Sequence, residues 1–303
     1  MSGGGGPIAA ALVTGAGGQL GRALVASAPA GIRLTALGST ELDIRDAAAV
    51  SEKLGRLRPD VVFNAAAYTA VDKAESEPEL ADALNHRAVA GLADACTQTG
   101  ARLVHVSTDY VFDGISGAPY EPDARTNPLS VYGRTKRDGE AAALASPGAL
   151  VVRTAWVYAP GGRNFVATML RLMSTRPEVR VVDDQIGSPT TAEGLAGALW
   201  ALAARGASGI HHWTDAGVAS WYDFAVAIRE EAEALGFDRV AAARVIPIRS
   251  SEFPTPARRP GVAILAKERT WRELGTTGEH WRDGLRRTIR RMTPGPGEVW
   301  RTE

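Results

Sequence analysis

A glycine-rich turn after the first apolar run most constrains the fold of this chain. Residues 8–14 are predicted to form a buried strand, and the turn Thr14-Gly-Ala-Gly-Gly-Gln-Leu-Gly21 leads into a helix predicted for residues 19–27. Glycines allow a tight turn and the close approach of a pyrophosphate, and the start of the helix offers free amides and a positive dipole end. We therefore predict dinucleotide-binding residues at Gly15, Gly18, Gln19, Leu20 and Gly21.

The first half of the chain alternates short apolar runs with helical patterns. Further strands are predicted at 32–37, 60–65, 102–107 and 150–153, and helices at 46–57, 79–99 and 128–145. Strands rich in valine and leucine, each followed by a helix, indicate a parallel sheet covered on both faces. The prediction is an α/β protein with a Rossmann-type, doubly wound parallel sheet, and residues 1–153 are predicted to be its NAD(P)-binding domain.

Residues 154–303 are predicted to form a smaller C-terminal lobe that binds the substrate. Helices are predicted at 164–174, 191–204 and 220–235, with strands at 179–182 and 210–213. The last strand is predicted to return to the sheet, so the chain re-enters the cofactor domain around 179–215. Residues 246–260 are rich in proline, serine and arginine, and are predicted to line the surface instead of forming a core element.

A tyrosine and a lysine lie one helical turn apart in Tyr132-Gly-Arg-Thr-Lys136, so both side chains leave the same helix face. An ammonium about 4 Å from a phenol favours the phenolate by roughly 4 kcal/mol at an effective dielectric of about 20. This predicts a tyrosine pKa below its usual value of about 10, in the range of a general acid. Together with the glycine-rich turn, the pair predicts an enzyme that moves a hydride between a nicotinamide and a carbonyl.

The end of the second predicted strand bears on the choice of nicotinamide. Sites that prefer NAD usually carry an acid there, which binds the ribose 2′-hydroxyl. Here the strand ends in Leu37-Gly-Ser-Thr40, and the first acid is Glu41. An end without an acid tolerates a 2′-phosphate, which Arg22 or Arg45 could approach. The predicted cofactor is NADPH, and NADH remains an alternative.

Charge and cysteine content exclude several other classes. The chain carries 34 basic and 34 acidic residues, so it lacks the electrostatic footprint of a nucleic-acid-binding protein. Cys96 is the single cysteine and is interpreted as a buried helix residue, which fits a reducing compartment. The apolar run at 8–13 is too short for a signal peptide or a membrane span. We expect a cytoplasmic protein without membrane partners, and interpret His105 as a packed core residue.

Several further motifs follow one another along nearly the whole chain. They are Asn64-Ala-Ala-Ala-Tyr-Thr-Ala-Val-Asp-Lys-Ala-Glu75, Ser107-Thr-Asp-Tyr-Val-Phe-Asp-Gly114, Tyr132-Gly-Arg-Thr-Lys136, Arg153-Thr-Ala-Trp-Val-Tyr158, Asn164-Phe165, Asp184-Gln-Ile-Gly-Ser-Pro-Thr190 and Arg258-Arg-Pro260. With these motifs the chain resembles the dTDP-4-dehydrorhamnose reductase family of the extended short-chain dehydrogenase/reductase superfamily.

The resemblance implies NAD(P)H-dependent reduction of the 4-keto group of dTDP-4-dehydro-β-L-rhamnose to give dTDP-L-rhamnose. It implies that Thr108 holds the carbonyl oxygen, that Tyr132 delivers a proton, and that Lys136 binds the nicotinamide ribose and lowers the tyrosine pKa. Implied cofactor contacts are Asp43, Ile44, Ala65, Ala66 and Ala67, besides Tyr132 and Lys136. Implied substrate contacts are Thr108, Asp109, Tyr110, Trp156, Asn164, Gln185 and Arg259.

One departure from the family concerns a metal. Some relatives link two subunits through a metal held by glutamates, one of them in the first helix, whereas this helix begins Gln19-Leu-Gly-Arg-Ala-Leu24 without a carboxylate. No metal site is therefore predicted, and both a monomer and a homodimer remain open.

Two other functions on the same fold remain open. The first is a sugar-nucleotide dehydratase or epimerase, although dehydratases of this superfamily carry an Asp-Glu pair where this chain has Asp109-Tyr110. The second is a non-catalytic, nucleotide-binding regulatory subunit.

Overall fold

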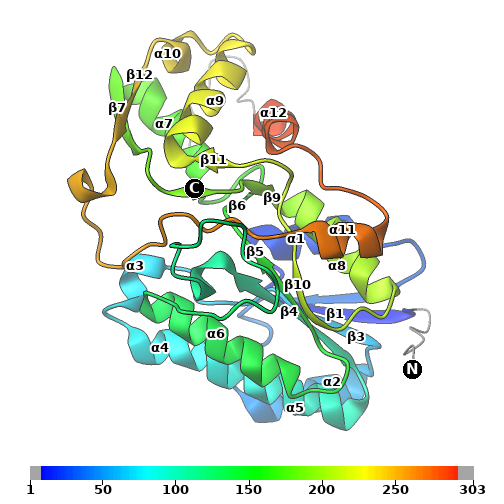
Figure 1. Ribbon diagram of the computed structural model, residues 1–303. Coiled ribbons are helices and arrows are strands. Elements are labelled where there is room, and N and C mark those ends of the chain that lie inside the picture. Colours follow the sequence, from blue (N-terminus) through cyan, green and yellow to red (C-terminus); the bar gives the residue numbers. More distant parts are fainter. Residues whose placement is uncertain (1–7, 293–303) are drawn as a thin grey trace.

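A six-stranded parallel sheet forms the centre of the molecule (Figure 1). The computed structural model describes residues 8–292. The strand order is β10-β5-β4-β3-β1-β2, and each pair of neighbours runs parallel. The strands are β1 Ala10–Thr14, β2 Arg33–Leu37, β3 Val61–Asn64, β4 Arg102–Thr108, β5 Leu150–Thr154 and β10 Gly209–His212. The predicted doubly wound α/β fold is confirmed, and β10 joins the sheet as expected.

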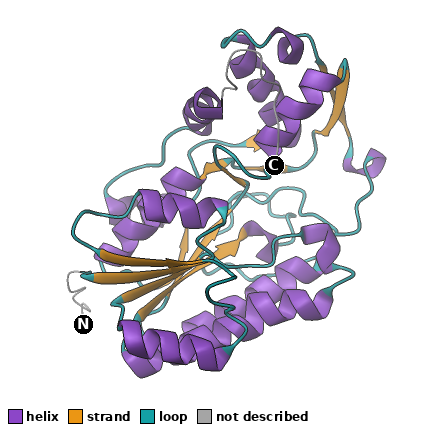
Figure 2. Ribbon diagram, turned by 180° about the vertical axis from the view of Figure 1, so that it is seen from behind, coloured by secondary structure: helices purple, strands orange, loops and turns teal. Residues whose placement is uncertain are grey.

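Helices cover both faces of this sheet, as the ribbons show (Figures 1 and 2). On one face lie α1 Gln19–Ala26, α8 Ala192–Ala204 and α11 Glu268–Leu274, and on the other lie α2 Ala47–Leu57, α5 Ala88–Thr99 and α6 Val131–Leu144. Each face has its own apolar core, and β1, β3 and β5 are buried along their whole length. Cys96 lies in one of these cores, where burial raises the pKa of its thiol to about 12.

Two helix predictions needed correction. The helix expected at 128–145 begins only at Val131, because the Ser130 hydroxyl accepts from Gly133 N at 3.1 Å and the Glu75 carboxylate accepts from Val131 N at 2.7 Å. The helix expected at 79–99 is divided into α4 Pro78–Asp82, a π-helical turn at Ala83–Arg87 and α5. Such turns often occur at functional sites.

The C-terminal lobe packs on a core of its own, at the top of Figure 1. It contains α7 Phe165–Thr175, α9 Trp221–Glu233, α10 Asp238–Ala241, α12 Trp281–Met292 and the parallel pair of β7 Glu178–Val182 and β12 Arg244–Ile248. The expectation of a surface segment from residue 246 was therefore wrong for its first residues, since Ile248 is buried. Pro247 is tolerated there because β12 has a partner on one side only.

Several short elements complete the described part of the chain. They are α3 Val71–Ala74, β6 Val157–Tyr158, β8 Ile186–Gly187, β9 Thr190–Thr191, β11 Ala219–Ser220 and the 3-10 turns Asp109–Val111 and Ser250–Glu252. β6 pairs with β9, and β8 pairs with β11. Among residues 8–292, no helix combines the length and apolarity needed to cross a membrane.

Candidate active site

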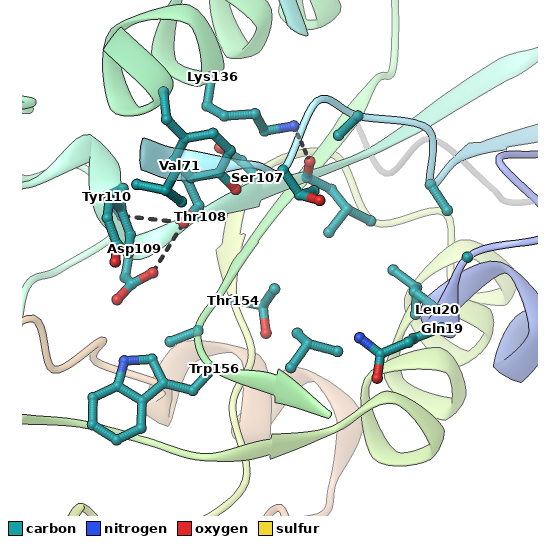
Figure 3. A pocket seen from close by; sticks show the side chains of 18 of the residues that line it. Gln19, Leu20, Val71, Ser107, Thr108, Asp109, Tyr110, Lys136, Thr154 and Trp156 are labelled. Atoms are coloured by element: carbon teal, nitrogen blue, oxygen red, sulfur yellow. Dashed lines mark hydrogen bonds between the residues drawn. The ribbon is translucent and has the colours of Figure 1, made fainter. Parts of the chain in front are cut away.

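A cavity of about 450 Å³ lies where the strand order reverses, at the carboxyl ends of the sheet strands (Figure 3). In open α/β sheets this is the usual place for a ligand. Many of the predicted site residues line it together: Gly18, Gln19, Leu20, Ala65, Ala66, Ala67, Thr108, Asp109, Tyr110, Tyr132, Lys136 and Trp156. In Figure 3, the Lys136 side chain extends from the top of the view, Gln19 and Leu20 of α1 lie at the right, and Trp156 lies at the lower left.

The glycine-rich turn is built so that no side chain obstructs it. Gly15 has a φ of +68°, and a Cβ there would lie 2.6 Å from Ala66 N. A Cβ at Gly21 would lie 2.2 Å from the Gly15 carbonyl oxygen, so α1 can approach the turn only without one. Gly18 is the N-cap residue of α1 and has no side chain to cap the helix, and the first turn of α1 contains no acidic residue. The turn therefore leaves amides free for an anion such as a pyrophosphate.

Tyr132 is buried in the cavity wall, where its ring meets that of Tyr110 edge-on at a centroid distance of 5.4 Å. Burial raises the pKa of the Tyr132 phenol, and a hydrogen bond with Thr108 opposes this increase. Asp109 and Tyr110 raise the pKa further. The predicted lowering by Lys136 is therefore not found, because desolvation of the phenolate outweighs the opposing contributions.

The Lys136 side chain is also buried, and its ammonium group contacts β4. Nζ donates to the Val106 carbonyl oxygen at 2.7 Å and lies 3.3 Å from His105 Nε2. Burial lowers the pKa of Lys136 to about 8, against an opposing effect of Glu140. Lys136 is thus a group that titrates near neutral pH.

Thr108 and Asp109 form a hydrogen-bonded pair at the end of β4. The Thr108 hydroxyl donates to Asp109 Oδ1 at 2.9 Å and accepts from Tyr110 N at 3.2 Å (Figure 3). Asp109 is only 2% exposed, and burial raises its pKa to about 7. This carboxyl group can therefore hold a proton near neutral pH.

Seven predicted contacts lie outside this cavity: Gly15, Gly21, Asp43, Ile44, Asn164, Gln185 and Arg259. Asp43 is exposed after β2 and pairs with Arg45 at 2.6 Å, and this pair holds the pKa of Asp43 below its usual value. Ile44 is buried in the core. Asn164 caps α7 by accepting from Ala167 N, and its Nδ2 donates to Gln19 Oε1 at 2.8 Å. Asn164 therefore links the lobe to the glycine-rich turn.

Gln185 and Arg259 line a second, larger hollow of about 800 Å³ in the lobe. The Arg259 guanidinium donates to Tyr110 Oη at 3.0 Å and to Asp72 Oδ2 at 2.7 Å. Trp221 lines this hollow as well as the first cavity, so the two hollows share a wall.

Sequence reasoning missed several lining residues, among them Trp221, Ser107 and Thr154. Trp221 stacks on Trp156 at a centroid distance of 3.5 Å and an angle of 4°, and Trp156 has a φ of +49°, which is uncommon for a bulky residue. The Ser107 and Thr154 hydroxyls are buried and have no partner among the described residues. Ser107 and Thr154 belong to motifs that carried the resemblance, whereas α9 offered no such signal for Trp221.

The fold and this arrangement together define a class. A dinucleotide turn between β1 and α1, a threonine at the end of β4, and a tyrosine and lysine on one face of α6 are the architecture of the extended short-chain dehydrogenases/reductases. Within residues 8–292, no group of three or more His, Cys, Asp or Glu side chains is placed to hold a metal ion.

Comparisons with known proteins identify the family. The sequence model described as "RmlD substrate binding domain" matches residues 9–293. A dTDP-4-dehydrorhamnose reductase of Mycobacterium tuberculosis is 48% identical over 84% of either chain. The reductase structures of Clostridium acetobutylicum and of Bacillus anthracis, the latter in complex with NADP, are 37% and 33% identical, each with a TM-score of 0.87. Both cover 93% of this chain, which spans 98% and 99% of theirs.

The chain therefore belongs to the dTDP-4-dehydrorhamnose reductase family, whose named members are oxidoreductases. The family predicted from the sequence motifs is confirmed. The roles of individual site residues remain predictions.

Proposed function

We propose that this protein reduces the 4-keto group of dTDP-4-dehydro-β-L-rhamnose to form dTDP-L-rhamnose, the last step in making this activated sugar. The observation that carries the proposal is that Thr108, Tyr132 and Lys136 line one cavity with the glycine-rich turn. The names of the relatives support this substrate, and the NADP complex of the Bacillus anthracis relative supports the cofactor.

The residues of the cavity fit a nicotinamide dinucleotide. Gly15 and Gly21 leave the space that its pyrophosphate needs, and Ser107 and Thr154 offer buried hydroxyls without protein partners. When bound, a reduced nicotinamide supplies the hydride that adds to the carbonyl carbon. We propose NADPH with NADH as an alternative, since β2 ends without an acid before Glu41.

Tyr132 is proposed to be the proton donor. A general acid must carry its proton before the reaction, and the raised pKa of Tyr132 keeps the phenol protonated at neutral pH. As the new C–H bond forms, the carbonyl π electrons move to oxygen, and the Tyr132 proton is transferred to that oxygen. The phenolate left on Tyr132 then takes up a proton from solvent. Thr108 holds the oxygen in place, and Lys136 binds the ribose hydroxyls.

The substrate is proposed to extend from this cavity into the lobe. Asp109, Tyr110 and Trp156 line the wall near Thr108, whereas Gln185 and Arg259 line the larger hollow beyond Trp221. Arg259 could bind the diphosphate by exchanging its carboxylate partner for the ligand. We assign substrate binding to residues 154–303 and cofactor binding to 1–153, with re-entry around 179–215.

The proposal includes the setting in which the protein acts. We propose a cytoplasmic monomer or homodimer that works without a divalent metal and without nucleic-acid or membrane partners. A chelator should therefore leave the activity unchanged, whereas loss of activity that magnesium restores would contradict the metal-free proposal.

The direct test is the loss of reduced-nicotinamide absorbance with authentic dTDP-4-dehydro-β-L-rhamnose, using NADPH and NADH in turn. We expect stoichiometric oxidation of the cofactor and a product with the mass and NMR spectrum of dTDP-L-rhamnose. A dehydratase or epimerase would return the hydride to the sugar and consume no external NADPH. A regulatory subunit would bind NADPH without oxidising it.

A further inference from the structure

A chain of buried polar side chains runs through the sheet to Lys136. The Thr14 hydroxyl at the end of β1 donates to Asn64 Oδ1 at 2.8 Å. Asn64 Nδ2 at the end of β3 lies 3.1 Å from His105 Nδ1 on β4, and His105 Nε2 lies 3.3 Å from Lys136 Nζ. All four side chains are buried, with residue exposures of 0–2%. Because these side chains are almost completely buried, their donors and acceptors should match one another.

A backbone amide determines which group donates and which accepts along this row of hydrogen bonds. Ala66 N–H donates to Asn64 Oδ1 at 3.2 Å, and an amide of this kind cannot accept. The Asn64 side chain is thereby oriented with its NH₂ group toward His105 Nδ1, which must accept. A neutral imidazole that accepts at Nδ1 carries its hydrogen at Nε2. An imidazolium would oppose the Asn64 donor, and burial together with Lys136 holds the pKa of His105 well below its usual value.

The Nε2–H group of His105 therefore points at Lys136 Nζ. An ammonium has three donors and no acceptor, so it would face this N–H donor to donor in a dry environment. A neutral amine has a lone pair that accepts from His105, and it still donates to the Val106 carbonyl oxygen. We propose that His105 is a positioning residue that donates a hydrogen bond to Lys136 Nζ and thereby stabilises the neutral amine form of Lys136.

The charged groups around Lys136 are compatible with this assignment. Glu140 on the same helix favours the ammonium, but both of its carboxylate oxygens are held by Arg153 of β5 at 2.8 Å. Tyr132 lies one turn away on α6, and Asp109 lies at the end of β4 beside Tyr132 and Thr108. The raised pKa of Tyr132 keeps its phenol uncharged at neutral pH. Asp109, with a pKa of about 7, is partly ionised there, but its carboxylate accepts from the Thr108 hydroxyl and forms no ion pair with Lys136. Asn85 of the π-helical turn, which bonds Thr135, is uncharged.

This inference rests on the proposed function only for the role of Lys136 at the active site. There it means that Lys136 can bind the ribose hydroxyls as a neutral amine, instead of only as a permanent positive charge. The balance between amine and ammonium then depends on one histidine that contacts neither substrate nor cofactor in the proposed reaction.

The first test reads the histidine directly and needs no activity. In protein labelled with ¹⁵N-histidine, long-range ¹H–¹⁵N correlation spectra distinguish the two tautomers, and His105→Asn assigns the signal. We expect the Nε2–H tautomer between about pH 6 and 8, with an Nε2 shift that follows the titration of Lys136 and loses this response in Lys136→Met. An Nδ1–H tautomer or an imidazolium would overturn the proposal, whatever the enzyme's substrate.

The second test uses two substitutions of His105 that distinguish the role of its Nδ1, which contacts Asn64, from that of its Nε2, which contacts Lys136. Asparagine at position 105 keeps an acceptor for Asn64 but no donor for Lys136, whereas glutamine can offer its carbonyl oxygen to the ammonium. NADPH oxidation should show a pH midpoint that reflects the titration of Lys136. We expect this midpoint to rise by about one pH unit in His105→Asn, because one buried hydrogen bond to the neutral amine is lost, and to rise at least as far in His105→Gln.

A matched control is His211→Asn, which alters another buried strand histidine, whose Nε2 contacts Glu273 instead of Lys136. It should change the melting temperature but leave the pH midpoint in place. An unchanged midpoint in both His105 variants with native-like melting would refute the role of His105. If those variants do not fold, the tautomer measured in the unmodified protein and in Lys136→Met still decides.

Discussion

Replacing Tyr132 with phenylalanine tests the proposed acid, because the change removes one oxygen atom and little else. The ring is 9% exposed and packs edge-on against Tyr110, and phenylalanine keeps these contacts. The lost hydrogen bond with Thr108 should change the free energy of unfolding by only about 1 kcal/mol. The folded protein and its glycine-rich turn should therefore survive the substitution.

The catalytic loss should be far larger. A positioned general acid contributes about 10²–10⁴-fold, which corresponds to roughly 3–5 kcal/mol of activation free energy. We expect the upper part of this range, because Tyr132 lies in a buried cavity wall where few solvent molecules can replace its proton. Water reaching the carbonyl oxygen would account for any residual turnover.

The assay is single-turnover loss of NADPH absorbance with saturating keto-sugar, alongside a fluorescence titration of NADPH affinity. Tyr132→Phe should slow the chemical step at least a hundredfold while the affinity stays unchanged. Tyr110→Phe is the matched control, since its hydroxyl bonds Arg259 and it should retain most of the chemical rate. A Tyr132→Phe rate close to that of the unmodified protein would refute the acid role.

Three further predictions follow from the same geometry. Gly21→Ala should weaken NADPH binding and lower the free energy of unfolding by about 1–3 kcal/mol, because its Cβ would overlap the turn. A Cβ at Gly17 meets nothing within 4 Å, so Gly17→Ala should leave the NADPH affinity and the melting temperature unchanged. The native protein keeps the Asp109 proton up to about pH 7, but the unfolded chain loses it near pH 4. The free energy of unfolding, measured by urea titration, should therefore fall by at most about 4 kcal/mol as the pH rises from about 4 to about 7, and Asp109→Asn should reduce this dependence on pH. Trp221→Leu should remove the stacking partner of Trp156 and raise KM for the nucleotide sugar more than it lowers kcat. An unchanged KM would contradict the proposal that the substrate extends past Trp221 from one hollow into the other.

Much of the architecture could be read from the sequence because it is set by local patterns. Apolar runs of strand length and the spacing between Tyr132 and Lys136 depend only on neighbours along the chain, as does the glycine turn that precedes α1. The predicted strands of the main sheet are all present, and the strand predicted at 210–213 returns to the sheet as β10 at residues 209–212. The weaker predictions lie in the lobe, where β12 contains a proline and pairs with a strand distant in sequence.

The sequence by itself determined that a tyrosine and a lysine share one helix face beside a dinucleotide turn, since helical geometry follows from spacing alone. Only the tertiary structure decided what surrounds them. Strands β1, β3 and β4 bring Thr14, Asn64 and His105 into line with Lys136. Burial of Tyr132 in the cavity wall raises the pKa of its phenol instead of lowering it. Desolvation and hydrogen-bond direction depend on every neighbour in space, and chain spacing carries no information about either.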